Sequence, residues 1–248
     1  MSDPAAVVVR RLRKSFGATR VLESLDLEVS AGDMVVVLGG SGSGKSVFLK
    51  HINGLLKPDS GEVLTLGQPV TTMRERDLVP LRRRVSYIFQ QGALFDSFTV
   101  GENIAFPLRE DGEKDVASLT ARVESLLEKV GLPGIAGVMP AELSGGMRKR
   151  VALARGLALN PTVILYDEPT AGLDPLTGEA IAALIGEVRQ TTGATSLVVT
   201  HDLGTARALG GRVAFLLNGR FDFVGTLDEA AREKSLVGRF VEAGGIHV

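Results

Sequence analysis

Short apolar runs typical of β-strands alternate along this chain with segments of helical periodicity. Continuous apolar runs at Met34–Leu38 and Val163–Tyr166 are typical of strands buried on both faces of a sheet. Further strands are predicted at Val7–Arg13, Glu23–Val29, Val85–Phe89, Ser196–Val199, Val213–Leu217 and Arg220–Val224. The alternation predicts an α/β fold in which helices cover a mostly parallel sheet.

Turn signals join two pairs of these strands. Phe16-Gly17 links the first pair, which predicts an antiparallel β part near the N-terminus. Asn218-Gly219 links the last pair, and Asn-Gly between two apolar runs is the strongest short hairpin signal.

Strand signals vanish between about residues 91 and 159. Apolar residues at helical spacing run over Asp115–Val130, followed by Gly131 at a C-cap position, and Met147–Leu159 is helical again up to Asn160-Pro161. A single domain is expected over residues 1–248, with an α/β core at about 1–90 and 160–230, a helical subdomain at about 91–159 and a C-terminal tail at 231–248.

Composition narrows the class of protein. The 28 basic and 29 acidic side chains give a formal net charge of −1, which excludes a globally basic nucleic-acid binder. The chain has no cysteine, which excludes disulfides, thiolate nucleophiles and cysteine-ligated metal clusters. No apolar run approaches the length of a spanning helix, and the first residues do not resemble a secretory signal. We therefore expect a cytoplasmic protein, with peripheral attachment to a membrane protein left open.

A glycine-rich segment, GGSGSGKS, follows the strand Met34–Leu38 and precedes a helix expected to reach about Leu56. It fits the pattern G-x-x-x-x-G-K-[ST], in which backbone N–H groups and a helix N-terminus surround phosphate oxygens. In this pattern Lys45 reaches the β- and γ-phosphates and Ser46 binds Mg²⁺. An ordinary glycine-rich turn is the alternative, which the strand–loop–helix context disfavours. The predicted nucleotide-binding residues are Gly39, Gly40, Ser41, Gly42, Ser43, Gly44, Lys45 and Ser46.

Two adjacent carboxylates, Asp167 and Glu168, follow the buried strand Val163–Tyr166. Nucleotide sites lie at the carboxyl ends of parallel strands, so these side chains are expected beside the glycine-rich loop. There Asp167 is predicted to bind Mg²⁺ and Glu168 to act on the attacking water. Taken alone, the pair is equally compatible with an ordinary strand end.

The segment Leu143-Ser144-Gly145-Gly146 is a second candidate anion site. A serine at a helix N-cap, followed by two glycines, exposes backbone donors at the positive end of the helix dipole. The first turn also carries Arg148, Lys149 and Arg150, which oppose that dipole. The alternative is a capped helix with solvated charges.

The order of these motifs resembles that of the ATP-binding-cassette ATPases. GGSGSGKS, Gln90, LSGG, ILYDEPTAGLD and the histidine of VVTHD occur in the family's order between about residues 7 and 225. The resemblance implies a P-loop core with a helical subdomain, and ATP and Mg²⁺ as cofactors. It also implies a homodimer in which ATP lies between the P-loop of one chain and the LSGG segment of the other.

The resemblance assigns roles residue by residue. Phe16 matches the aromatic residue that stacks on adenine, Gln90 the residue that links Mg²⁺ and water to the helical subdomain, and His201 the histidine that contacts the γ-phosphate. The alternative for Phe16 is a core aromatic residue beside a turn. Without the motif order, His201 is better interpreted as a structural histidine. Tyr87 and Phe89 are interpreted as core strand residues.

These assignments divide the predicted site into three sets. The catalytic residues are Glu168, His201 and Gln90; the Mg²⁺-binding residues are Ser46, Gln90 and Asp167; and the residues that reach the partner's ATP are Ser144, Gly145, Gly146 and Asp174. Met147 departs from the commonest family pattern, which has Gln there, because a thioether cannot donate a hydrogen bond as an amide does.

A narrower resemblance is to the ATPases of Mla-type phospholipid transporters, which work with MCE-domain lipid carriers. It rests on KSVFLKHINGLLKPDSGEV, FQQGALFDSFTVGENIAFPLRE, LSGGM and LVGRFVEAG. It implies a subunit that powers phospholipid transport at the cytoplasmic face of the inner (plasma) membrane. The partners implied are integral membrane permease subunits in separate chains, an MCE-domain protein and a small STAS-like protein, with no nucleic acid.

An apolar cluster follows Gln90, and it has two interpretations: docking groove for a permease helix, or packing within the helical subdomain. Its members are Leu94, Phe95, Phe98, Val100, Ile104 and Phe106.

Three functions compete: a transport ATPase subunit, a soluble cassette ATPase acting on ribosomes, DNA or iron–sulfur assembly, and a P-loop kinase or nucleotide sensor. The single cassette disfavours the second, and LSGG, Gln90 and His201 in order disfavour the third.

Overall fold

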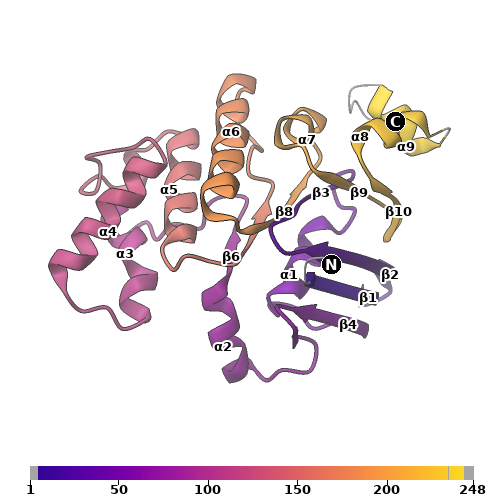
Figure 1. Ribbon diagram of the computed structural model, residues 1–248, viewed down its shortest axis with the longest axis horizontal. Helices are drawn as coiled ribbons and strands as arrows, with labels where there is room; N and C mark the ends of the chain where they lie inside the picture. The colour runs from indigo at the N-terminus through magenta and orange to yellow at the C-terminus, as the bar shows by residue number, and fades with distance from the viewer. Residues whose placement is uncertain (1–4, 234, 243–248) are drawn as a thin grey trace.

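The computed structural model describes residues 5–233 and 235–242, and contains two β-sheets with helices around them (Figure 1). The smaller sheet has the strand order β2-β1-β4-β5. Its strands are β1 (Ala5–Phe16), β2 (Thr19–Ser30), β4 (Ser60–Thr65) and β5 (Gln68–Pro69). β1 pairs antiparallel with β2 and β4, and Phe16 opposes Thr19 at the turn between the first two strands. The predicted antiparallel part near the N-terminus is therefore confirmed.

The larger sheet has the strand order β10-β9-β3-β8-β7-β6. Its strands are β3 (Met34–Leu38), β6 (Val85–Ile88), β7 (Val163–Asp167), β8 (Thr195–Thr200), β9 (Arg212–Leu217) and β10 (Arg220–Gly225). All neighbours pair in parallel except β9 and β10, which form the hairpin predicted at Asn218-Gly219. The predicted α/β fold with a mostly parallel sheet is confirmed.

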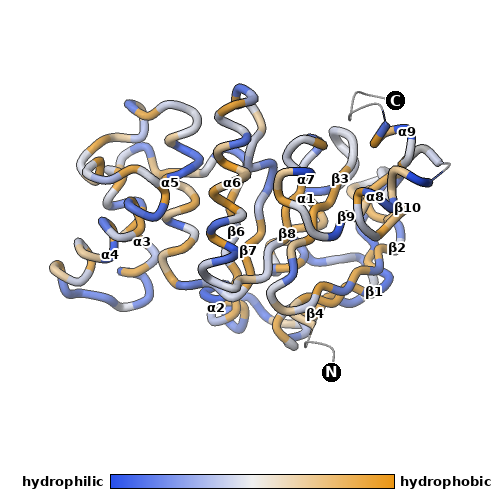
Figure 2. The backbone as a smooth tube through the Cα atoms, turned by 45° about the horizontal axis from the view of Figure 1, so that its top comes forward, coloured by the Kyte–Doolittle hydropathy of each residue, from blue (hydrophilic) through white to orange (hydrophobic). Residues whose placement is uncertain are grey.

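Every residue of β3, β7 and β8 is buried, and alternate side chains contribute to two separate cores. Val36, Ile164 and Val198 pack in the core that includes the helices of the 100–209 region. Val35, Leu165 and Leu197 pack in the core that includes the smaller sheet. Figure 2 shows apolar backbone positions along these inner strands. Burial on both faces explains why these segments are continuously apolar.

The helices fall into groups by their place in the molecule. α1 (Lys45–Ile52) and α2 (Glu75–Arg84) pack in the core shared with the smaller sheet, whereas α6 (Pro175–Thr192) and α7 (Leu203–Leu209) pack in the core on the other face of the larger sheet. At one end of the molecule lie α3 (Val100–Glu110), α4 (Val116–Lys129), the short 3₁₀ helix η1 (Pro140–Glu142) and α5 (Gly145–Leu157) (Figure 1). At the other end lie α8 (Leu227–Arg232) and α9 (Leu236–Glu242).

The helix expected to reach Leu56 ends at Ile52 instead. Gly54 adopts the left-handed region with φ +72, and the Gly54 N–H donates to the His51 carbonyl oxygen at 3.3 Å. A glycine in this conformation ends a helix by turning the chain away from its axis. A side chain at Gly54 would also lie 2.8 Å from a methyl group of Leu78, so the chain packs closely against α2 here.

Candidate functional site

The glycine-rich segment, residues 39–44, forms a tight loop between β3 and α1. The loop passes too close to its neighbours for larger residues at two positions. A Cβ at Gly39 would lie 2.5 Å from the Leu216 carbonyl oxygen, and a Cβ at Gly44, where φ is +100, would lie 2.9 Å from side-chain atoms of Val21 and Leu22. The path of the backbone therefore requires glycine at these two positions.

Lys45 follows the loop and is 6 % exposed. Its ammonium group donates to the carbonyl oxygens of Gly39 at 2.8 Å and Gly40 at 2.9 Å, so the loop is wrapped around this charge. The Lys45 ammonium also lies 3.3 Å from Oε1 of Glu168. The arrangement places a buried positive charge at the N-terminus of α1, where an anion is already favoured by the helix dipole.

Asp167 ends β7, and both oxygens of its carboxylate accept hydrogen bonds. Oδ1 accepts from the Ser46 hydroxyl at 2.7 Å and Oδ2 from the Tyr87 hydroxyl at 2.7 Å. Asp167 is 5 % exposed, so these donors fix the carboxylate without help from bulk water. Strand β7 thus holds a carboxylate directly against the first turn of α1.

Glu168 bridges the loop and the end of β8. Its backbone has φ +47, a left-handed conformation that is costly for a residue with a side chain, and its N–H donates to the Val199 carbonyl oxygen at 2.9 Å. Its Oε2 lies 3.0 Å from Nδ1 of His201, while Oε1 faces Lys45. Strain of this kind is concentrated at functional sites because the surroundings hold the residue there.

Tyr87 lies at the candidate site, although the sequence indicated only a core strand residue. It does pack against the core, as expected, and its ring lies 4.5 Å from that of Phe89. Burial and the neighbouring Asp167 carboxylate raise the pKa of Tyr87, so its hydroxyl remains a donor at neutral pH. The contact depends on β6 lying beside β7, and strand order was not evident from the sequence.

A pocket of ≈ 550 Å³ brings together most of the predicted nucleotide residues. Its lining residues are Phe16, Val21, Ser41, Gly42, Ser43, Gly44, Lys45, Ser46, Val47, Gln90, Glu168 and His201. Phe16 is 48 % exposed, so it is not a core aromatic residue, and its ring is presented at the edge of this pocket. His201 is likewise exposed in part, with its imidazole against the Glu168 carboxylate.

The predicted residues of the LSGG segment do not line this pocket. Ser144 caps α5, its hydroxyl accepting from the Met147 N–H at 3.2 Å. Gly146 is buried, and a Cβ there would lie 2.7 Å from a methyl group of Thr177 on α6. Met147 is half-buried and packs against the core of the helical region.

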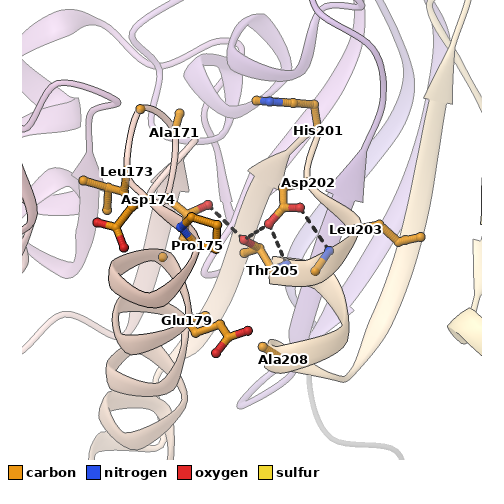
Figure 3. A pocket seen from close by; sticks show the side chains of 15 residues that line it. Ala171, Leu173, Asp174, Pro175, Glu179, His201, Asp202, Leu203, Thr205 and Ala208 are labelled. Carbon is orange, nitrogen blue, oxygen red and sulfur yellow. Dashed lines mark hydrogen bonds between the residues drawn. The ribbon is translucent and has the colours of Figure 1, made fainter. Parts of the chain in front are cut away.

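Asp174 caps α6 and lines a second pocket of ≈ 610 Å³, shown in Figure 3. His201 stands at the rim of this pocket, and Asp202 below it accepts from the Gly204 N–H at 3.1 Å and the Thr205 N–H at 2.7 Å. Within one chain Asp174 and the LSGG segment are therefore separate from the pocket around Lys45.

α5 begins at Gly145, so the three basic residues expected in its first turn lie at the end of that turn and in the next. Their side chains are not simply solvated, because all three donate to backbone carbonyl oxygens. Arg148 donates to Leu143 at 2.6 Å and Arg150 to Val130 at 2.9 Å. Lys149 donates to the carbonyl oxygens of Gln90 and Glu168, the latter at 3.2 Å. Burial lowers the pKa of Lys149, and the nearby carboxylates of Glu168 and Asp167 oppose that shift.

The residues present fit a nucleotide with Mg²⁺. The hydroxyl of Ser46 and the carboxylate of Asp167 supply the hard oxygen ligands that Mg²⁺ prefers, and one carboxylate suffices where phosphates complete the shell. Among the described residues, no group of three or more His, Cys, Asp or Glu side chains could hold a metal alone. The buried hydroxyl of Ser43 has no hydrogen-bond partner within the described part of the chain, which leaves a polar atom of the loop available to a ligand.

In the described ranges of the chain, no helix is both long and apolar enough to cross a bilayer.

The sequence is similar to transport ATPases. A model of the ABC transporter family matches residues 22–171. The sulfate/thiosulfate import ATP-binding protein CysA of Caulobacter vibrioides is 43% identical over 240 residues, which are 95% of this chain and 69% of that protein. The probable ribonucleotide transport ATP-binding protein mkl of Mycobacterium leprae is 40% identical over 240 residues, or 94% and 69% of the two chains. The methionine import ATP-binding protein MetN of Mesorhizobium japonicum is 42% identical over 220 residues, or 88% of this chain and 60% of that protein.

The fold is similar to solved ATP-binding cassettes. The dimeric structure of a post-hydrolysis state of the cassette MJ0796, bound to ADP and Pi, has a TM-score of 0.82 and 34% identity, covering 89% of this chain and 98% of that chain. The structure of cbiO1 from Clostridium perfringens, part of the cbiONQ transporter complex, has a TM-score of 0.84 and 28% identity, covering 96% and 95%. The chain belongs to the ABC transporter family as its ATP-binding cassette, and members of this family use ATP together with Mg²⁺.

Proposed function

We propose that this chain hydrolyses ATP as one half of a homodimer and thereby drives transport through a separate membrane permease. The observation that carries the proposal is the position of the Glu168 carboxylate, which is held by Lys45 on one side and by His201 on the other, beside the Ser46–Asp167 pair. Phosphoryl transfer needs little covalent chemistry from a protein. It needs positioned charges and a group that orients the attacking water.

The polar residues at and beside the pocket have distinct roles in this proposal. Bound ATP with Mg²⁺ supplies the phosphoryl group and a charge that neutralises the phosphate oxygens. Lys45 and the loop N–H groups bind the phosphates, while Ser46, Asp167 and Gln90 hold the cation. Glu168 accepts a hydrogen bond from water and orients it, and His201 fixes the Glu168 carboxylate by the contact at 3.0 Å.

The dimer is supported by residues that lie outside the pocket of their own chain. Ser144, Gly145 and Gly146 stand at the start of α5, where the N–H groups at the helix N-terminus favour an anion, and they do not line the pocket around Lys45. Asp174 belongs to the pocket of Figure 3 instead. A second copy would bring these residues to the ATP held around Lys45. The related cassette MJ0796 forms a dimer in its ADP- and Pi-bound structure.

The apolar segment after Gln90 supports contact with a permease. Val100 and Ile104 are fully buried and therefore belong to the core. Phe95, Phe98 and Phe106 form a separate aromatic cluster, with ring centroids 5.0 to 6.1 Å apart, and Phe95 is 42 % exposed. An exposed aromatic cluster of this kind is suited to receive an apolar partner helix.

Buried Asn103 gives this aromatic cluster a fixed backbone. Its side-chain amide donates to the carbonyl oxygens of Phe95 at 3.1 Å, Phe98 at 3.1 Å and Thr99 at 3.0 Å, and its Oδ1 accepts from the Phe95 N–H at 2.8 Å. A loop held by four hydrogen bonds presents its side chains in one arrangement, which lowers the entropic cost of docking. The proposed docking site thus lies on the helical subdomain expected at about residues 91–159.

The proposed substrate is a phospholipid. This part of the proposal rests on the resemblance of GALFDSFTVGENIAFPLRE and LSGGM to Mla-type ATPases. It adds an MCE-domain protein and a small STAS-like protein as partners, and places the complex at the cytoplasmic face of the inner membrane. The alternative is an ABC transporter with another substrate, and the names of the related CysA, mkl and MetN proteins favour small polar solutes.

Replacing Glu168 by Gln tests the hydrolytic role. Gln keeps the size of the side chain but cannot accept a proton, so we expect turnover to fall about 10²–10⁴-fold while ATP binding is retained. Turnover is measured as phosphate release by the purified complex, and binding by titration with labelled ATP. Parent-like turnover of the Glu168→Gln complex would remove Glu168 from this role.

Replacing Phe95 by Ala tests docking. Loss of one large apolar contact of about 1.5–3 kcal/mol is expected to weaken co-purification with the permease about ten- to a hundred-fold. The free energy of unfolding of the free subunit should stay within about 1 kcal/mol, since the side chain is partly exposed. The matched control is Val79→Ala on α2, where an apolar side chain is 50 % exposed and does not belong to the aromatic cluster. A loss of about 3–5 kcal/mol in unfolding free energy would instead identify Phe95 as a core residue.

The substrate class is tested on the same purified complex. We expect organic extraction to recover phospholipid in amounts comparable to the complex, and addition of phospholipid to raise the rate of ATP hydrolysis. Stimulation by sulfate, methionine or a ribonucleotide, with no effect of phospholipid, contradicts the lipid assignment and leaves the ATPase assignment in place.

A further inference from the structure

The backbone that follows β6 lies directly on α5 and is bonded to it at three carbonyl groups. Lys149 donates to the carbonyl oxygen of Gln90, and Arg155 donates to those of Gly92 at 2.7 Å and Ala93 at 2.8 Å. Gly92 is buried, and a Cβ there would lie 3.2 Å from Cβ of Ala152 on the same helix. Movement of residues 90–93 away from α5 would therefore break the hydrogen bonds that Lys149 and Arg155 donate to these three carbonyl groups.

Lys149 differs from Arg155 because it also bonds the opposite side of the pocket. Its ammonium group donates to the Glu168 carbonyl oxygen at 3.2 Å. An ammonium group has three donors and no acceptor, so one Lys side chain can bind two carbonyl groups at once. The single charge of Lys149 thus joins the backbone at Gln90 to the backbone at Glu168, although these residues follow two different strands, β6 and β7.

The neighbouring cations of the same helical turn make no such link. Arg148 donates to Leu143 and Arg150 to Val130, both within the helical region. Glu168 itself is held at three groups. Its N–H donates to the Val199 carbonyl oxygen, its carbonyl oxygen accepts from Lys149, and its carboxylate lies beside Lys45 and His201. The Lys149 contact is one of the restraints that hold the strained Glu168 backbone at φ +47.

We propose that Lys149 is a positioning residue for hydrolysis, which fixes Gln90 and Glu168 of its own chain relative to α5. The inference rests on the proposed function. Ser144, Gly145 and Gly146 stand at the start of α5, about one helical turn before Lys149. Any shift of that helix end on contact with the nucleotide of a second copy therefore reaches Gln90 and Glu168 through this ammonium group. Lys149 itself touches backbone atoms and takes no part in the chemistry.

Replacement of Lys149 by Met tests this link. The side chain of Met is about as long as that of Lys and resembles its apolar methylene part, but Met cannot donate a hydrogen bond to either carbonyl group. We expect kcat for ATP hydrolysis by the purified full-length protein to fall about ten- to a hundred-fold, the scale of a small misplacement of catalytic groups. The Kd for labelled ATP should stay within about twofold, because no phosphate-binding group is changed. Lys149→Arg, which retains a cationic donor, should restore most of the parent kcat.

The matched control is Arg150→Met, which removes a cation of the same turn that donates to Val130 alone. Its kcat should remain within about threefold of the parent value. If Lys149→Met does not fold, Lys149→Gln replaces it. Its amide can donate to one of the two carbonyl groups, and an intermediate kcat is expected.

Two outcomes overturn the inference. One is a Lys149→Met protein with parent kcat. The other is a fall in kcat that is accompanied by a comparable loss of ATP affinity or by a large loss of thermal stability, or that Arg150→Met shows as well. Each of these results marks Lys149 as a purely structural residue. A parent protein that hydrolyses no ATP contradicts the proposed function itself, and the two failures are thus distinguished.

Discussion

The parallel register of three buried strands is the constraint on which the site depends. β8 lies between β3 and β7 and pairs with both, so that Leu38 opposes Thr200 and Asp167 opposes Val199. The residues that directly follow β3, β7 and β8 all leave the sheet at the same edge. The glycine-rich loop, the Asp167–Glu168 pair and His201 therefore meet there, as expected for ligand sites at the carboxyl ends of parallel strands.

The same register explains why the site is held so tightly. A slip of one residue in β7 would exchange the faces of Ile164 and Leu165 between the two cores, so the apolar pattern prevents it. With the strands fixed, Glu168 is forced into its left-handed conformation and its carboxylate lies between Lys45 and His201. The free energy that holds this strained residue comes from burial of the sheet around it.

Several parts of this arrangement follow from the sequence alone. The continuous apolar runs predicted the bounds of β3 and β7 almost to the residue. Asn218-Gly219 predicted the β9–β10 hairpin, and the helical spacing after Asp115 predicted α4. The glycine-rich loop was located by its pattern, and the pocket around it contains Phe16, as adenine stacking would require.

Other parts could not be predicted because they depend on contacts between distant segments. β4, which pairs with the distant strand β1, was missed for this reason. α6 was missed although it carries local signals of a helix, Asp174 at the N-cap, Pro175 after it and Gly193 at the C-cap. Tyr87 meets Asp167 across 80 residues and Lys149 meets Gln90 across 59 residues, and neither pairing leaves a local pattern. Local sequence signals locate elements and motifs, whereas strand order decides which side chains become neighbours.

The central claim is that each ATP site is completed by a second copy of the chain. It is tested by mixing two variants, Lys45→Ala, which damages the phosphate loop, and Ser144→Arg, which places bulk and charge at the LSGG segment. Each variant alone should hydrolyse little ATP. Their mixture should recover about a quarter of the parent rate, because random pairing makes half of the dimers mixed and each mixed dimer has one intact site of two. A mixture as inactive as its components, or a Ser144→Arg chain as active as the parent, contradicts the claim.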